Sequence, residues 1–470
     1  MRILQSSLLL VVFSTASGPL TAQSEPVQEL AILELMQSIR QHHPAIFSAR
    51  ASREQADTAV QRAQGAFDLG IEQNTLSRLN GYYDGQYFEQ GVSQPLEIAG
   101  ASIGASYRRS EGSFPLYEDF FNTLSGGELS LDLSFSLLRN RDIDARRTAM
   151  ADAPLQQNIG ELQEILTINQ LLFDGLNTYL SWYRAFLETE ALRTLVELAE
   201  TRREAIESRV ASGDLAAITL TEFETILLTR QIALQESLQR LLQSQQQLLF
   251  FWRDETGQTA SLNSLVGPQV PLQWPFEGFQ FDDQWQQQII DNHPSIADLD
   301  AQLQIARNQE RLTKNRLLPQ LDIEMKLGND FGSGNNYLNS PESYVGLNFS
   351  VPLQRNRAKA EHMAALARIN EVEFDRQVQY DRLTVSLNES LLQLQTFNQL
   401  RILRRQQADI AHELEAQERI RFEEGDSDQF LLNTREAAAG QAELEAIAAE
   451  VLWLSQQLRL LALGINLLDY

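Results

Sequence analysis

The chain contains one series of landmarks twice, in the same order. A His-Pro element, a junction ending in Arg-Asn-Arg and an Arg-x-x-x-Gly-Asp element each occur in both halves. They lie at 42–46 and 292–296, at 135–141 and 349–357, and at 209–214 and 421–426. The offset between the copies drifts slowly, from 250 to 214–216 to 212. Such a repeat predicts two copies of one structural unit.

Each half follows the same plan of helix, β-region and helical hairpin. In the first repeat, 23–266, these parts are expected at about 44–65, 67–138 and 142–256, with the hairpin turning at 211–217. In the second repeat, 282–470, they are expected at about 294–318, 320–353 and 356–463, with the turn at 424–428. The segment between them, 267–281, contains helix-breaking Gly and Pro residues and is interpreted as a connector.

The long helices are predicted from the spacing of apolar residues. In the first, Leu162, Leu166, Leu172, Leu176 and Leu180 recur in three- and four-residue steps and their multiples, with charges on the other faces. About 70 residues of helix extend about 100 Å. No compact domain has a core that wide, so these helices are expected to pack lengthwise as coiled-coil neighbours.

The β-regions alternate apolar and polar residues, as at 129–137, 321–327 and 345–351. Period two places one set on each face of a strand. A lipid-facing, water-filled barrel requires this pattern, although a soluble sheet packed on helices would alternate equally well. In the barrel reading, the charged residues of the polar face line the lumen: Asp132, Asp322, Glu324 and Lys326.

The number of strands limits how such a barrel could close. About four strands per chain cannot close, and open edges are not tolerated in lipid, so several copies must contribute. The first β-region has 36 more residues between its landmarks than the second, including Gln86–Gln94 and Ala99–Arg108. We expect these residues to form an extracellular hairpin rather than further strands of the barrel.

Composition narrows the class of protein. The formal charge of −25 disfavours a nucleic-acid partner. The absence of cysteine excludes disulfides, thiolate metal sites and a lipid-anchored cysteine. Residues 1–22 read as a signal peptide, with Arg2, an apolar core at 8–13 and a cleavage position at Ala22.

Motifs typical of catalysis are not found in the sequence. The histidines His42, His43, His293, His362 and His412 show no metal-ligand spacing, and neither a phosphate loop nor a nucleophile elbow is present. His43 and His293 occupy equivalent positions before proline, which favours a role at a helix boundary. We therefore predict a protein that is not an enzyme and has no cofactor or metal site.

With its doubled landmarks and the helical run at 177–183, the sequence resembles the TolC family of outer-membrane efflux proteins. The resemblance implies a mainly α fold with a membrane β-barrel: a homotrimer with a barrel of about 12 strands in the outer membrane and a helical tunnel across the periplasm. It also implies an exit duct for efflux or type I secretion, working with a periplasmic adaptor (membrane fusion) protein and an inner-membrane transporter.

The resemblance places both hairpin turns at the periplasmic tip, where an adaptor docks. The residues concerned are Ala211, Ser212, Gly213, Asp214, Leu215, Gly425, Asp426 and Ser427. The glycines suit a helix end that needs positive φ. Asp214 and Asp426 are expected to cap the helices that follow. Capping alone would explain Gly-Asp in any helical hairpin.

The second turn is rich in acids, namely Glu423, Glu424, Asp426 and Asp428. Some family members have rings of aspartate slightly farther along, where this chain has Leu431 and Thr434. Threefold repetition of the four acids would focus a negative potential at the tunnel entrance. The hypothesis is that this ring favours cations and binds divalent metals weakly; a merely solvated acidic hairpin is the plain alternative.

A different class of protein fits part of the pattern. A periplasmic coiled-coil adaptor or structural spacer would share long hairpins, but such adaptors usually have one hairpin and lipoyl-like β-domains. A stand-alone porin is disfavoured because most of the chain is expected to be helical.

Overall fold

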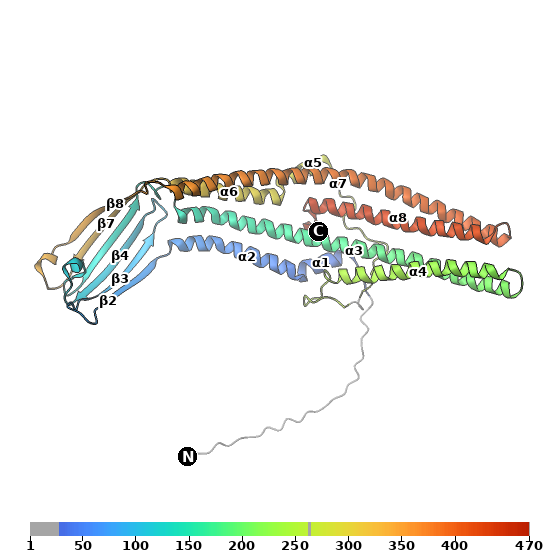
Figure 1. Ribbon diagram of the computed structural model, residues 1–470, viewed down its shortest axis with the longest axis horizontal. Coiled ribbons are helices and arrows are strands. Elements are labelled where there is room, and N and C mark those ends of the chain that lie inside the picture. Colours follow the sequence, from blue (N-terminus) through green and yellow to red (C-terminus); the bar gives the residue numbers. More distant parts are fainter. Residues whose placement is uncertain (1–27, 262–264, 470) are drawn as a thin grey trace, which may run out of the picture.

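The computed structural model describes residues 28–261 and 265–469, so the signal peptide expected at 1–22 lies outside the described residues. The molecule is a long strip with a sheet at one end and two helical turns at the other (Figure 1). The helices are α1 (Ile32–His42), α2 (Pro44–Gln64), α3 (Ala145–Ala211), α4 (Ala217–Leu248), α5 (Asp283–Asn292), α6 (Pro294–Asn315), α7 (Asn356–Glu424) and α8 (Gln429–Leu463). The strands are β1 (Gln28–Leu30), β2 (Gly70–Ser77), β3 (Gln86–Pro95), β4 (Ser102–Glu111), β5 (Glu128–Ser136), β6 (Leu265–Pro268), β7 (Gln320–Asp330) and β8 (Glu342–Ser350).

The two histidines before proline have the same structural role in both repeats. The Nδ1 atom of His43 accepts the backbone N–H of Ala45 at 3.2 Å, and that of His293 accepts the N–H of Ser295 at 3.1 Å. Each therefore caps the helix that follows it, α2 or α6. The proline sits in the first turn, where no backbone N–H is needed.

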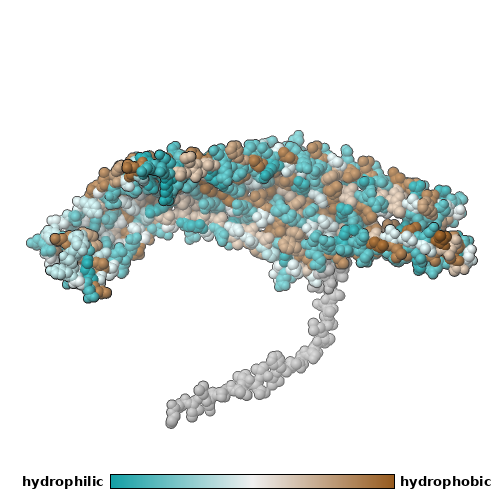
Figure 2. All heavy atoms as spheres, in the orientation of Figure 1, coloured by the Kyte–Doolittle hydropathy of each residue, from teal (hydrophilic) through white to brown (hydrophobic). Residues whose placement is uncertain are grey.

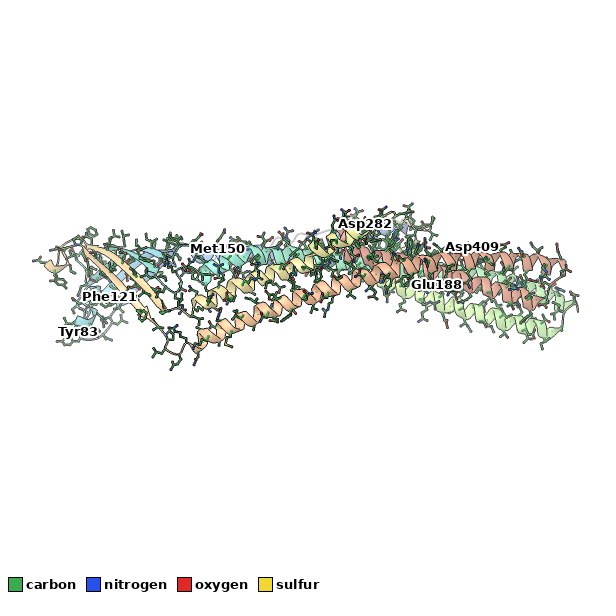
Figure 3. The ribbon with its side chains drawn as sticks, turned by 90° about the horizontal axis from the view of Figure 1, so that it is seen from above. Tyr83, Phe121, Met150, Glu188, Asp282 and Asp409 are labelled. Carbon is green, nitrogen blue, oxygen red and sulfur yellow. The ribbon has the colours of Figure 1, made fainter. Side chains whose placement is uncertain are left out.

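The long helices α3 and α7 contain 67 and 69 residues, which corresponds to about 100 Å each. Near the sheet, α2, α3, α6 and α7 lie side by side, and toward the far end α4 and α8 replace α2 and α6 (Figure 1). Figure 3 shows the same arrangement from above, with Met150 beside the sheet and Glu188 and Asp409 in the two hairpins. The return helix α4 ends at Leu248, earlier than the expected 256, and Phe251, just beyond its end, packs against the main core.

The main hydrophobic core lies at the middle of the strip, where the two repeats meet. Leu172 and Tyr179 of α3 and Leu458 of α8 are fully buried there. The hydroxyl of Tyr179 donates a hydrogen bond to the carbonyl of Leu30 in β1 at 2.8 Å. Strand β1 pairs in parallel with β6 from the connector. The two repeats are thus joined by core packing. The β1–β6 ladder, which spacing alone did not predict, links the start of the first repeat to its end and to the first residues of the connector.

The sheet has the order β2-β3-β4-β5-β7-β8, with every neighbouring pair antiparallel. The expectation of an extracellular hairpin in the first β-region is therefore wrong, because β3 and β4 are integral strands between β2 and β5. Their connecting turn lies at the helical end of the sheet, where the Ser136 N–H donates to the Ala99 carbonyl at 3.0 Å. The chain contributes six strands to this sheet, rather than about four.

Candidate functional site: the sheet faces and the hairpin tips

The strand register places most apolar residues of the six strands on one face of the sheet. Residues directly opposite each other in antiparallel strands share a face. One row across the sheet is Ile71, Val92, Ala105, Leu131 and Leu327. The next is Ile103, Leu133, Met325 and Val345, followed by Phe135, Ile323 and Leu347.

This apolar face is the exposed one. Leu131, Val345 and Leu347 are 53%, 67% and 64% exposed in the single chain, whereas Ser130 on the opposite face is only 2% exposed. A soluble sheet packed on helices would bury its apolar side. The interpretation of the alternating residues as such a sheet is therefore wrong. A contiguous apolar face of this kind marks contact with lipid or with another protein.

The four charged residues singled out in the strands lie together on the polar face. Asp132 is directly opposite Lys326 in the register, Glu324 is opposite Ser134, and Asp322 is opposite Ser136. The Ser136 hydroxyl donates to Asp322 Oδ1 at 2.7 Å. Asp132 and Glu324 also line a hollow on this face, together with serines and glycines of β3 and β4.

Glu128 is a charged residue of the polar face that sequence reasoning missed. The residue is 6% exposed, and its carboxylate forms an ion pair with Arg108 of β4 and lies 3.3 Å from Lys326 Nζ of β7. It therefore joins three consecutive strands. Its position at the start of an alternating strand was the available signal, but its partners are far away in the sequence.

The two hairpin turns have the same backbone. Gly213 and Gly425 have φ of +81° and +86°, the left-handed region that favours glycine. In both turns the following aspartate N–H donates to the carbonyl of an arginine five residues earlier, at 2.9 Å for Asp214 and 2.8 Å for Asp426. The repeated Arg-x-x-x-Gly-Asp element therefore encodes one turn geometry.

The expectation that Asp214 and Asp426 cap the following helices is wrong. The cap residue of α4 is Ala216, with no side-chain hydrogen bond, and Asp214 instead pairs with Arg209 at 2.7 Å. The cap of α8 is Asp428, whose side chain accepts the Leu431 N–H at 2.8 Å. In both hairpins, the cap residue therefore lies two positions after the aspartate of the Gly-Asp element.

The acids of the second turn are at the surface. Glu423, Glu424, Asp426 and Asp428 are all exposed. The side chain of Asp428 is also held in place, because it accepts the hydrogen bond that caps α8. Across residues 28–261 and 265–469, no group of three or more His, Asp or Glu side chains is placed to hold a metal ion.

A buried charge cluster links the two hairpins behind the tips. Glu436 of α8 is 1% exposed and pairs with Arg202 of α3 and with Arg230 of α4, the latter at 3.1 Å. This cluster was not predicted from the sequence. The signal was an acid on the same helical face as buried Leu432 and Ala439.

Within the described ranges, α8 is long and apolar enough to span a membrane by length and composition. Half of its most apolar window is buried, and it packs along α3 and α7. That is the behaviour of a core helix. In Figure 2 hydrophobic residues are scattered along the rods among hydrophilic ones.

The fold, a curved strip of paired hairpins that ends in a sheet with an exposed apolar face, is similar to that of solved outer-membrane channels. Solved structures of this class have the same fold. VceC from Vibrio cholerae matches with a TM-score of 0.67 at 14% identity, covering 92% of this chain and 96% of that one. CmeC from Campylobacter jejuni matches with a TM-score of 0.67 at 12% identity, covering 98% and 94%.

The open state of MtrE from Neisseria gonorrhoeae also matches with a TM-score of 0.67, at 12% identity, covering 92% and 88%. Residues 285–464 match the family described as Outer membrane efflux protein. The predicted resemblance to outer-membrane efflux proteins is thus confirmed by the family match over residues 285–464. No curated protein matches the sequence significantly.

Proposed function

We propose that the protein is the outer-membrane exit duct of an envelope efflux system and works as a homotrimer. The exposed apolar face of the sheet is the observation on which this proposal depends. Burying such a face in the bilayer removes apolar area from water, and the polar face then lines a wet lumen. Asp132, Asp322, Glu324 and Lys326 contribute to that lumen.

The helices supply the second part of the proposal. Rods of about 100 Å, attached to a membrane sheet, reach far across the periplasm. The two hairpin turns, 211–215 and 425–427, then lie at the inner end of the tunnel, where they dock an adaptor connected to an inner-membrane transporter. Passage through the duct is passive, so no catalytic residue is needed.

Cell fractionation tests this function. The protein is expected in outer-membrane fractions as a heat-modifiable trimer, and deletion of its gene is expected to abolish export by the partner pump.

Cysteines at positions 212 and 424 that crosslink neighbouring tips should also stop export. Transport that continues with the crosslinks formed would show that the tips need not separate.

A further inference from the structure

The first β-region supplies two more strands than the second, and both are full members of the sheet. All ten residues of β3 pair with β4, eight of them also pair with β2, and seven residues of β4 pair with β5. These strands follow the same division of faces as the rest. One row of the polar face runs Ser93, Gly104, Asp132 and Lys326, and the adjacent apolar row runs Val92, Ala105, Leu131 and Leu327.

Six strands match the width of the helices below them. Helices α2, α3, α6 and α7 lie side by side, and at about 10 Å each they span about 40 Å. Strands spaced about 4.8 Å apart and tilted about 40° each take up about 6 Å of circumference, so six span about 38 Å, whereas four would span about 25 Å. The six-stranded sheet therefore continues the helical layer without narrowing.

The two edge strands have opposite directions. Strand β2 leaves α2 and runs away from the helices, and β8 runs back toward α7 (Figure 1). They contain eight and nine residues. In lipid their unpaired backbone groups must find partners. Pairing β8 of one copy with β2 of the next would preserve the antiparallel alternation found throughout the sheet.

We infer that three copies close a barrel of eighteen strands through β2–β8 ladders, an inference that rests on the proposed trimeric duct. By the same spacing and tilt, the barrel is about 36 Å across between backbones, compared with about 24 Å for twelve strands. Its lumen face contains many small residues, among them Gly91, Gly104, Gly328 and Gly346. The membrane section thus forms a wide aqueous passage that admits bulky hydrated cargo.

Single cysteines test whether β4 lies in the barrel wall, and the chain has no cysteine of its own. In intact outer membranes, a membrane-impermeant maleimide should label S102C and S106C, which face the lumen, but not I103C and A105C, which face lipid. The matched control pair is S134C and L133C on β5. If labelling alternates on β5 while all four β4 positions react, the eighteen-stranded barrel is wrong, but the proposed duct is still supported. If β5 does not alternate, both are wrong.

Distances between spin labels test the strand count. In trimers reconstituted in lipid, labels at L133C should be about 10 Å farther apart than in a twelve-stranded barrel. This is roughly 0.87 of the change in diameter from about 24 to about 36 Å, because the three labels are related by threefold symmetry. Labels at E190C on α3 serve as the control, because that side chain is about half exposed and lies far from the sheet. If E190C gives an intersubunit distance but L133C gives the spacing of a twelve-stranded barrel, the eighteen-stranded barrel is wrong and the trimer is still supported. No intersubunit distance at E190C would overturn both.

Discussion

Arg202 of α3 donates from Nη1 to Oε2 of Glu436 in α8 at 2.7 Å, and this ion pair ties the first helical hairpin to the second. Both groups are sheltered, with side-chain exposures of 12% and 1%. Arg230 of α4 reaches the same carboxylate. One buried acid therefore holds helices from both repeats together just behind the proposed docking tips.

Replacing this acid should destabilise the protein strongly. Glu436→Ala leaves two arginines without their buried partner, and losing one member of a buried pair costs about 3–5 kcal/mol. Thermal unfolding of the purified trimer should show a clear drop in Tm. Glu371→Ala is the control, because its pair with Arg368 is exposed and should contribute nothing measurable. Equal effects of the two variants would contradict the structural role of the cluster.

The tip glycines should tolerate asparagine better than valine. Nothing lies within 4 Å of a Cβ added to Gly425, so the cost of a substitution there comes from the positive φ alone. Gly425→Val should cost more than about 1 kcal/mol, and Gly425→Asn less, because Asn adopts the left-handed region more readily. Adaptor binding and unfolding should be measured for both. An identical loss in both variants would point to a contact made by the glycine itself.

Stability should fall as the pH drops below about 6.5. Burial lowers the pKa of His293 and of His43, and Arg253 lowers that of His43 further. The unfolded chain then binds more protons in this range, so stability is complete above the ordinary pKa of about 6.5 and is lost as the pH falls. A pH series of Tm values measures the slope.

Replacing His43 and His293 by asparagine distinguishes the effect of their protonation from the effect of their helix caps. His43→Asn and His293→Asn keep a side-chain acceptor for the helix N–H but cannot be protonated, so the double variant should show a flatter pH profile. Alanine variants should lose stability at every pH. A slope that survives in the asparagine variant would assign the pH dependence to other groups.

The acids of the second turn should set ion selectivity at the entrance. Substituting Glu423 and Glu424 by Gln, with Asp426 and Asp428 changed to Asn, removes up to twelve charges from the proposed trimer. Asn at position 428 retains a good helix cap. The reversal potential in a salt gradient should then move toward zero. Unchanged ion selectivity would show that these acids are only solvated surface groups and do not influence which ions pass.

Sequence periodicity predicted the helices well, because their ends depend on local residues. The second long helix was expected at 356–424, and α7 has those bounds. Gly425 ends it through its own backbone freedom. The cap of α8 was misplaced because Asp426 and Asp428 are chemically equivalent, and only the turn geometry selects Asp428.

Long-range pairing was much harder to predict. Residues 86–94 and 99–108 were recognised as β-prone, but whether they joined the sheet depended on ladders with β2 and β5 that no local pattern specifies. The same applies to Glu436, whose partners Arg202 and Arg230 are more than 200 residues away. The exposed apolar face also needed the structure, since alternation alone cannot tell which face the helices cover.

Contact between the apolar face of the sheet and lipid is the basis of the proposed function. Sedimentation of the processed protein with and without detergent tests it most directly. The proposed function predicts that extraction requires detergent and that the protein sediments as a trimer. A stable, water-soluble monomer in the absence of lipid or detergent would contradict it.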